Sequence, residues 1–478
     1  MKLTLQGHSE LYAVEQLMMQ LFPEEAEGEA VSTLSAGTTY LTATAKISLH
    51  GRTGRGTKRL PIGEKDNVRL RRRILQQSFY LAAVEVLGFS PPWGALAGVR
   101  PTKLVSAHLL AGGTEQSADK LLKDTYFVSG ARRRLCIDSA RHTVETARLL
   151  RPKDLSVYVG IPFCPTRCAY CSFVSQSVEK FGKDLAPYLD ALEREIRRTG
   201  ALLQKTGRTV RTLYMGGGTP TTLSAPQMER LLSVIRESFD LSECLEFTVE
   251  GGRPDTLDLE KLQVIRQGGA DRMSINPQTM SDDVLRRIGR NHTTAQTLRA
   301  YEDAKTAGFD GINMDLIAGL PGDSVDSFLN SVEKVIALEP SNITVHTLAL
   351  KKAAALYQSR DALPSGQAVS EMLTRTEEAL RRAGYEPYYL YRQKYMSGSF
   401  ENVGWCKRGF TGLYNICMME ELHTIVSLGG GGVTKLVDRH TGYIQRVANA
   451  KYPQEYIQKI DAICADKARV AEFCRQHG

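Results

Sequence analysis

Six short apolar segments recur through the middle of the chain, and a polar stretch long enough for a helix follows nearly every one. They span residues 157–161, 212–215, 246–249, 272–275, 311–317 and 343–348. Strands that alternate with helices are typical of a parallel sheet, because each parallel connection must cross back over the sheet. The pattern predicts an α/β fold over residues 151–350, with six βα units that form an open sheet or a partial TIM-type barrel.

The regions on either side of these repeats have a different pattern. A chain of 478 residues exceeds what one hydrophobic core usually organises, so two or three domains are expected. We expect residues 1–150 to form a compact α+β domain that binds a substrate or partner. We expect residues 351–478 to form an α+β extension that covers the active site. The elements expected in the first region are strands at 3–5 and 38–49 and helices at 10–21 and 68–87, and the second should hold a helix at 368–383.

Charge is uneven along the chain. The net charge is +8. Many of the basic residues precede the repeats, namely Arg52, Arg55, Lys58, Arg59, Arg69, Arg71, Arg72, Arg73, Arg132, Arg133 and Arg134. Such runs suit an anionic partner, either RNA or a multiply carboxylated metabolite, although a solvated face with no ligand is as common a meaning.

Nothing in the sequence indicates export or membrane insertion. The first residues lack the basic and apolar regions of a signal peptide, and no apolar run is long enough to cross a bilayer. The nine cysteines are scattered in a way that suggests reduced thiols. We therefore expect a cytoplasmic protein with no membrane partner.

Three of the cysteines stand directly after the first strand. Cys164, Cys168 and Cys171 have C-x3-C-x2-C spacing. Three thiolates can hold a four-iron cluster and leave one iron open for a small molecule. A structural zinc site would usually need a fourth ligand in a second pair, which the chain lacks, and Cys406 and Cys417 are too far apart to hold another cluster. The spacing therefore predicts an iron-sulfur loop.

Polar residues also follow the other predicted strands. Gly216–Gly218 and Thr219 form a glycine turn whose exposed amides and carbonyls can bind a zwitterion. Four more polar side chains stand at or just past strand ends, namely Glu250, Gln278, Arg290 and Asp315. Each alone could be a satisfied core group, but ligand sites of parallel α/β folds collect at the carboxyl ends of strands. We therefore predict that these residues share one site.

The cysteine spacing and the aromatic residue before Cys171 resemble the radical S-adenosylmethionine (SAM) superfamily. Three further motifs occur in order, Tyr158-x-x-Ile-Pro-Phe-Cys, Gly216-Gly-Gly-Thr-Pro-Thr and Asp315-Leu-Ile-x-Gly-Leu-Pro. With the later segments 391–394, 401–405, 412–415 and 427–432, the chain resembles the oxygen-independent coproporphyrinogen III oxidase family, in its HemZ-type (coproporphyrinogen dehydrogenase-like) branch.

This resemblance implies a [4Fe-4S] cluster on the three cysteines and bound SAM. The residues that it places against SAM are Tyr158, Gly217, Gly218, Thr219, Glu250, Gln278, Arg290 and Asp315, with Tyr158 also at the reacting centre. The implied reaction is a radical decarboxylation of two propionates of coproporphyrinogen III to vinyl groups, which gives protoporphyrinogen IX. Electrons would come from a reduced flavodoxin or ferredoxin-type protein.

An anionic tetrapyrrole substrate needs cations that hold its propionates, and arginine suits this role. Charge and family position suggest Arg100, Lys103, Arg392 and Lys394.

Two departures from relatives matter. Phe173 stands where the oxidase has a fourth cysteine, and Gly160 stands where haem-chaperone relatives have a histidine, which argues against a pure haem carrier. A haem-modifying or haem-degrading SAM enzyme, an RNA-modifying radical SAM enzyme and a haem-trafficking protein remain alternatives.

Overall fold

The computed structural model describes residues 1–22, 27–349, 354, 356, 363–392 and 400–477. They form two compact units. The first unit comprises Met1–Arg141 and Leu390–Asn402, and the second comprises His142–Tyr389 and Val403–Gly478. The domain roles expected from the sequence stay predictions.

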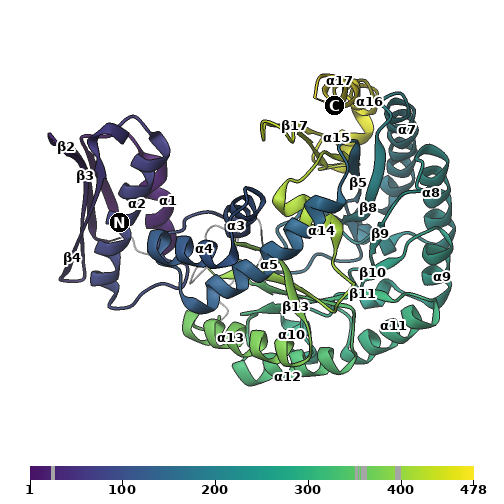
Figure 1. The fold of residues 1–478 in the computed structure, drawn as a ribbon. Helices are drawn as coiled ribbons and strands as arrows, with labels where there is room; N and C mark the ends of the chain where they lie inside the picture. Colours follow the sequence, from purple (N-terminus) through teal and green to yellow (C-terminus); the bar gives the residue numbers. More distant parts are fainter. Residues whose placement is uncertain (23–26, 350–353, 355, 357–362, 393–399, 478) are drawn as a thin grey trace. The chain divides into compact units, whose positions relative to one another are not determined.

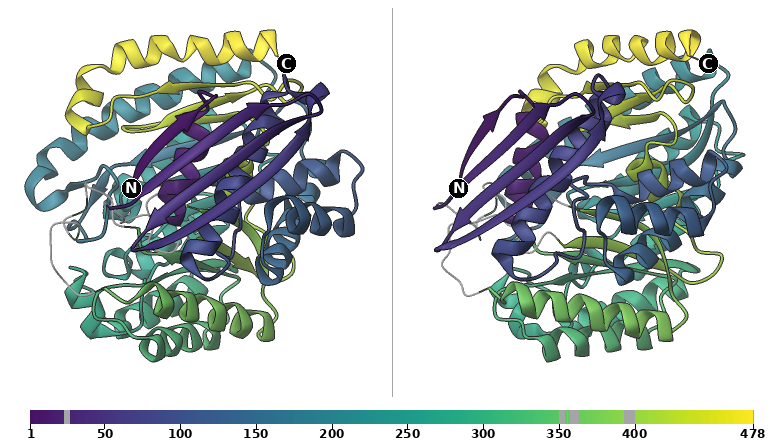
Figure 2. Two further views of the ribbon diagram at one scale, coloured as in Figure 1. Left: turned by 90° about the vertical axis from the view of Figure 1, so that its left-hand side faces the viewer. Right: turned by 60° about the vertical axis from the view of Figure 1, so that its left-hand side comes forward.

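The first unit contains a four-stranded sheet with two helices on one face (Figures 1 and 2). The strands are β1 (Lys2–Gln6), β2 (Glu29–Ala36), β3 (Tyr40–Leu49) and β4 (Arg52–Pro61), in that order across the sheet. The helices are α1 (Leu11–Leu21) and α2 (Val68–Leu87), whose apolar residues share one core with the sheet. The two helices were expected to within one residue, whereas β2 and β4 were not expected.

Helix α2 lies directly on β4 because two glycines of that strand leave room for it. A Cβ atom on Gly54 would stand 2.1 Å from the Ala82 carbonyl oxygen, and one on Gly56 would stand 1.9 Å from that of Ser78. The Asn67 side chain accepts a hydrogen bond from the Leu70 amide and fixes the start of the helix. Shorter helices complete the unit, α3 (Pro101–Leu110), α4 (Glu115–Lys120) and the first part of α5 (Gly130–Leu149).

The second unit is built around the six predicted strands, and all of them pair in parallel. They are β5 (Asp154–Ile161), β8 (Thr209–Gly217), β9 (Glu246–Glu250), β10 (Arg272–Ser274), β11 (Gly311–Ala318) and β12 (Asn342–Thr347). Neighbours in the sequence are neighbours in the sheet. Within the described residues the sheet stays open, so the predicted partial barrel is confirmed and no closed barrel forms.

Helices cover the outer face of this curved sheet (Figure 1). They are α7 (Leu185–Gln204), α8 (Ala225–Ser238), α9 (Leu259–Gln267), α11 (Thr294–Thr306), α12 (Val325–Ala337) and α13 (Gly366–Arg382). Capping boxes at Ser224 and Thr293 fix the starts of α8 and α11. None of the helices in the described ranges has the length and apolar character needed to cross a bilayer.

The chain after residue 385 extends the sheet at both ends. At one end β14 (Glu401–Cys406) pairs antiparallel with β12, and β13 (Glu386–Arg392) follows it. At the other end β15 (Ile425–Leu428) pairs in parallel with β5, followed by β16 (Val433–Val437) and β17 (Ile444–Ala448). The remaining helices are α14 (Leu413–Glu420), α15 (Pro453–Gln458), α16 (Ile460–Asp466) and α17 (Ala468–Gln476). The parallel strand β15 was not expected.

Candidate radical SAM site

The three cysteines lie on the loop that leaves the carboxyl end of β5. All three are half-buried, and none of them forms a disulfide. The Cys171 amide donates to the Cys168 carbonyl oxygen at 3.1 Å, which turns the chain between them. The Thr219 hydroxyl donates to the Cys164 sulfur at 3.5 Å. Burial raises the pKa of Cys164, and the hydrogen bond from Thr219 opposes that rise because it favours the thiolate.

Neighbouring elements hold this loop in place. The Arg253 guanidinium donates to the Thr166 hydroxyl at 2.7 Å and forms an ion pair with Asp255 at 2.6 Å. The Ala169 amide donates to the Ile288 carbonyl oxygen at 3.0 Å, just past α10 (Asp282–Arg287). The cysteine loop is therefore held by the segment after β9 and by the segment after α10.

The donor set of the loop fits a three-thiolate cluster. Within the described part of the chain, no group of three or more His, Cys, Asp or Glu side chains is arranged to hold a single metal ion. A cubane cluster has a different requirement, since each cysteine binds its own iron and the sulfur atoms need not meet at one point. Three thiols on one fixed loop meet that requirement.

The glycine turn after β8 packs against the start of the cysteine loop. Gly217 has a φ of +116°, a left-handed conformation that favours glycine. A Cβ on Gly218 would stand 2.5 Å from the Phe163 carbonyl oxygen. The Gly218 amide donates to the Ile161 carbonyl oxygen at 2.8 Å, and the Thr219 amide to that of Phe163 at 2.7 Å. These two amides, expected to face a ligand, bond within the protein instead, and the SAM contacts of the turn stay predictions.

Three tyrosine rings stack beside the turn. The ring centroids of Tyr158 and Tyr214 are 6.2 Å apart, and those of Tyr214 and Tyr414 are 4.5 Å apart. Tyr414 comes from α14, whose first amides at Leu413 and Tyr414 donate to the Glu246 carboxylate at 2.6 and 3.1 Å. The Tyr414 hydroxyl is buried and finds no partner among the described residues. Sequence reasoning found Tyr158 but missed Tyr214 and Tyr414.

Two carboxyl groups near this stack have opposite protonation tendencies. The pKa of Glu250 is raised to about 7, chiefly by burial and in part by the nearby Asp315, and the Tyr214 hydroxyl limits the rise by donating to Glu250 Oε1 at 2.5 Å. For Asp315, burial would raise the pKa, but His346 and Asn313 outweigh it and lower the pKa. The Asn313 amide donates to Asp315 Oδ1 at 2.7 Å. Near neutral pH the site therefore holds one carboxyl close to its titration midpoint and one ionised carboxylate.

Gln278 and Arg290 carry buried polar atoms that have no partner among the described residues. Gln278 is 6 % exposed with a φ of +68°, and its side-chain oxygen accepts no hydrogen bond there. Arg290 donates from Nη1 to the Asn276 carbonyl oxygen at 2.6 Å, while its Nε has no acceptor. Burial would lower the pKa of Arg290, but Tyr170 and Cys168 raise it above its ordinary value. A buried polar atom without a partner needs an explanation, and a bound ligand would supply the missing partner.

The predicted substrate residues lie in the first unit or outside the described residues. Arg100 precedes α3, and Lys103 is exposed on that helix. Arg392 is 4 % exposed, donates to the Leu96 carbonyl oxygen at 2.6 Å and stacks over the Trp93 ring. Burial lowers its pKa to about 10. Lys394 lies outside the described residues, and a substrate role for all four stays a prediction.

The tetraglycine at residues 429–432 joins β15 to β16 beside Gly160. The Gly430 amide donates to the Tyr188 hydroxyl at 2.8 Å, and that hydroxyl donates to the Gly160 carbonyl oxygen at 2.7 Å. The Gly429 amide donates to Glu195, which forms a buried ion pair with Lys467 at 2.8 Å. These amides are used inside the protein, so the turn supports the end of β5.

Comparison with known proteins identifies this arrangement. Residues 158–335 match the model of the radical SAM superfamily, so the chain contains a radical SAM domain. The chain is 38% identical over 390 residues to the oxygen-independent coproporphyrinogen-III oxidase-like protein HemZ of Bacillus subtilis, across 80% of this chain and 78% of that relative. The chain belongs to this HemZ family, which confirms the resemblance seen in the sequence.

Two further similarities are more limited. The heme chaperone HemW of Bacillus subtilis is 34% identical over 242 residues, which span 49% of this chain and 62% of the chaperone. The structure of coproporphyrinogen III oxidase HemN from Escherichia coli superposes with a TM-score of 0.54 at 24% identity, over 69% of this chain and 78% of that one. The HemN similarity concerns the fold and confirms the open radical SAM architecture.

Proposed function

We propose that the protein is a radical SAM enzyme of haem metabolism that oxidatively decarboxylates two propionates of coproporphyrinogen III to vinyl groups, which gives protoporphyrinogen IX. For each propionate, one hydrogen atom would pass to the 5'-deoxyadenosyl radical, CO2 would leave, and one electron would pass to an external one-electron acceptor. The observation that carries the proposal is the loop of Cys164, Cys168 and Cys171, whose first cysteine lies beside the glycine turn through its contact with Thr219. The oxidase-like name of the HemZ relative and its 38% identity support this choice of substrate.

The residues of the site divide the work of such a reaction. Cys164, Cys168 and Cys171 would hold the [4Fe-4S] cluster, and together with SAM it would supply a 5'-deoxyadenosyl radical when both are bound. Asp315 keeps a negative charge near neutral pH, which suits a ligand with ammonium and sulfonium groups. Glu250, with its pKa raised to about 7 by burial, can accept or give up a proton at the same pH.

The tyrosine stack has a second role in this proposal. Tyr158, Tyr214 and Tyr414 form an aromatic wall beside Glu250. Such a wall excludes water, and radical chemistry requires that exclusion because solvent would quench or divert a reactive intermediate. The buried hydroxyl of Tyr414 is also free of partners in the described structure, so it can donate a hydrogen bond to a bound molecule.

A haem-carrier role is the second candidate, and the similarity to HemW favours it. The structure explains why Gly160 separates this chain from relatives with a histidine there. A Cβ on Gly160 would stand 3.3 Å from the Leu428 carbonyl oxygen and 3.3 Å from Tyr158 Cε1. A histidine would require β15 or the tyrosine ring to give by a few tenths of an ångström, and the glycine that stands there offers no side chain to a haem iron.

The test is an anaerobic reaction of the reconstituted protein with reductant, SAM and coproporphyrinogen III, followed by mass spectrometry. We expect 5'-deoxyadenosine and loss of two CO2 units, and neither in a Cys164→Ala control. S-adenosylhomocysteine formed with haem would indicate a haem-modifying enzyme, and haem binding without SAM cleavage would indicate a carrier. A flavodoxin- or ferredoxin-type electron donor and a cytoplasmic location stay predictions.

A further inference from the structure

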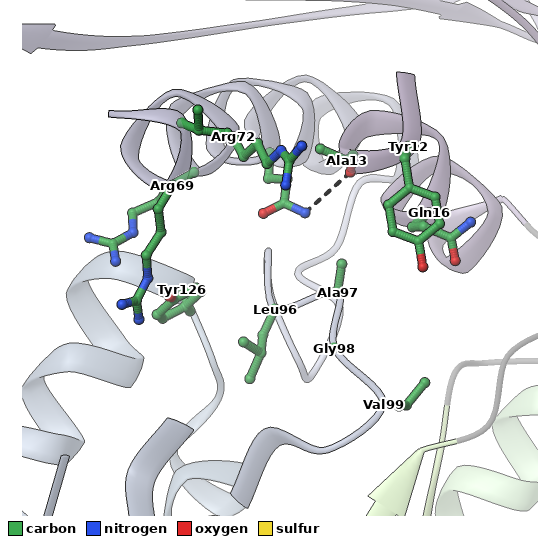
Figure 3. A pocket seen from close by; sticks show the side chains of 13 residues that line it. Tyr12, Ala13, Gln16, Arg69, Arg72, Leu96, Ala97, Gly98, Val99 and Tyr126 are labelled. Carbon is green, nitrogen blue, oxygen red and sulfur yellow. Dashed lines mark hydrogen bonds between the residues drawn. The ribbon is translucent and has the colours of Figure 1, made fainter. Parts of the chain in front are cut away.

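The first unit contains a cavity of about 690 Å³ that the radical SAM chemistry does not use. Figure 3 shows it between three segments, with Arg69 and Arg72 on α2, Tyr12 and Gln16 on α1, and the stretch Leu96–Val99 opposite them. A volume between about 300 and 1,000 Å³ is typical of sites for small molecules and cofactors. The cavity is therefore large enough for a ligand of metabolite size.

One wall of the cavity is cationic. Arg69, Arg72 and Arg73 lie at positions i, i+3 and i+4 of α2, so they share a face of the helix. Arg72 pairs with Glu10 at 2.6 Å, whereas Arg69 and Arg73 have no carboxylate partner among the described residues. Among the described residues that line the cavity, none is acidic. The wall therefore favours an anionic ligand.

One of these cations is already oriented. The Arg73 guanidinium lies over the ring of Tyr126 at 5.7 Å from its centroid, a cation–π contact that limits the freedom of the side chain. Arginine can bind a carboxylate through two parallel hydrogen bonds. Arg69 and Arg73 together can therefore hold two carboxylates from one side of the cavity.

The other walls are aromatic and aliphatic. Tyr12, Val68 and Val99 line the cavity although they are 68 %, 42 % and 37 % exposed, respectively. Leu96, Ala97 and Gly98 add apolar surface opposite the arginines (Figure 3). Exposed apolar side chains that gather around a cavity are typical of a binding site, because a ligand can remove them from water. The walls suit a flat ligand with an apolar body.

Arg392 supports the stretch that faces the arginines. Its backbone amide donates to the Val99 carbonyl oxygen at 2.7 Å, and its guanidinium donates to the Leu96 carbonyl oxygen at 2.6 Å. Both ends of the stretch Leu96–Val99 are thereby tied to one buried residue. The cavity wall is held in shape by the protein itself, so a ligand is not needed to form it.

We infer that this cavity is a second tetrapyrrole site, which holds a porphyrin-type ring against the apolar walls and two of its propionates on Arg69 and Arg73. The walls of the cavity indicate a flat, anionic ligand. The choice of a tetrapyrrole as that ligand rests on the proposed function. Single-stranded nucleic acid needs a groove that tracks several phosphates. The cations that line this cavity in the described part of the chain all stand on the single helix α2, so a small polycarboxylate fits it better than RNA.

The test is a fluorescence titration of coproporphyrin III into the full chain, without SAM and in a Cys164→Ser/Cys168→Ser/Cys171→Ser background that cannot hold a cluster. We expect Arg69→Gln/Arg73→Gln to weaken binding about tenfold or more, since each lost charged contact to a carboxylate contributes measurably. The matched control is Arg55→Gln/Arg59→Gln. It removes the same amount of charge from β4, and neither Arg55 nor Arg59 lines the cavity. The tetramethyl ester of coproporphyrin, which has no carboxylates, should bind about tenfold more weakly than the acid.

Three results would overturn the inference. The first is that the background protein does not bind the porphyrin. The second is that the Arg69→Gln/Arg73→Gln variant and the Arg55→Gln/Arg59→Gln control bind it equally well. The third is that tRNA displaces the porphyrin at lower concentrations than free coproporphyrin does. Formation of 5'-deoxyadenosine by the unaltered, cluster-loaded protein is measured separately. Failure of the cavity site is thereby distinguished from failure of the proposed function.

Discussion

Replacing Glu250 with glutamine should remove a pH-dependent loss of stability from the second unit. Burial raises the pKa of Glu250 from its ordinary value of 4.5 to about 7. A carboxyl whose pKa is raised on folding stabilises the folded state below pH 4.5, and this contribution disappears as the pH rises through 7. A shift from 4.5 to about 7 corresponds to about 3 kcal/mol, of which about 2 kcal/mol is lost between pH 5.5 and 8.5.

The assay is urea unfolding of the cluster-free protein at pH 5.5 and 8.5. The chain has two tryptophans, so a Trp93→Phe background leaves Trp405, buried in the second unit, as a single fluorescent probe. Going from pH 5.5 to 8.5, the protein with Glu250 should lose about 2 kcal/mol more than the Glu250→Gln variant. Glu229→Gln, at an exposed position of α8, is the control and should behave like the parent. Equal pH slopes for parent and Glu250→Gln would refute the argument.

Three further substitutions test other contacts. Lys467→Met should reduce the free energy of unfolding by about 3 to 5 kcal/mol, because it leaves the Glu195 carboxylate buried without its cationic partner. Denaturant unfolding measures this loss, and a loss below about 1 kcal/mol would contradict the argument. Gly218→Ala should reduce the free energy of unfolding by about 1 to 3 kcal/mol, because the added Cβ meets the Phe163 carbonyl oxygen. It should also lower the iron content after reconstitution, which chemical iron analysis measures. Unchanged iron content and unchanged stability would refute the close packing. Tyr414→Phe should change the free energy of unfolding by less than about 1 kcal/mol, since the hydroxyl has no partner in the described structure. The same variant should form 5'-deoxyadenosine more slowly in the presence of substrate. A large loss of thermal stability would argue against a hydroxyl without a partner.

The repeated strands were predictable because their signal is local. The segment expected at 212–215 is part of β8 (Thr209–Gly217), and the one expected at 246–249 is part of β9 (Glu246–Glu250). Their order in the sheet, which was not predicted from the sequence, agrees with the rule that consecutive βα units place neighbouring strands side by side. Glu250 and Asp315 could be selected for the same reason, since a carboxylate at the end of an apolar strand (Glu250) or inside one (Asp315) stands out in the sequence.

The missed features depend on contacts between distant parts of the chain. Strand β15 has only four residues, and its pairing with β5 brings residue 425 beside residue 156. Tyr414 joins the tyrosine stack because Glu246 of β9 binds the first amides of α14. The substrate role expected of Arg392 stays a prediction, but its burial beside Trp93 was not foreseen because it is set by packing that the sequence does not display. Local patterns carry no information about such pairings.

The most direct test of the proposed reaction follows one hydrogen atom. Coproporphyrinogen III with deuterium on the propionate carbon β to the carboxylate is incubated with the cluster-loaded protein, reductant and SAM, and 5'-deoxyadenosine is analysed by mass spectrometry. We predict one deuterium in 5'-deoxyadenosine for each CO2 released. Unlabelled 5'-deoxyadenosine together with intact deuterated porphyrinogen would contradict the proposed decarboxylation.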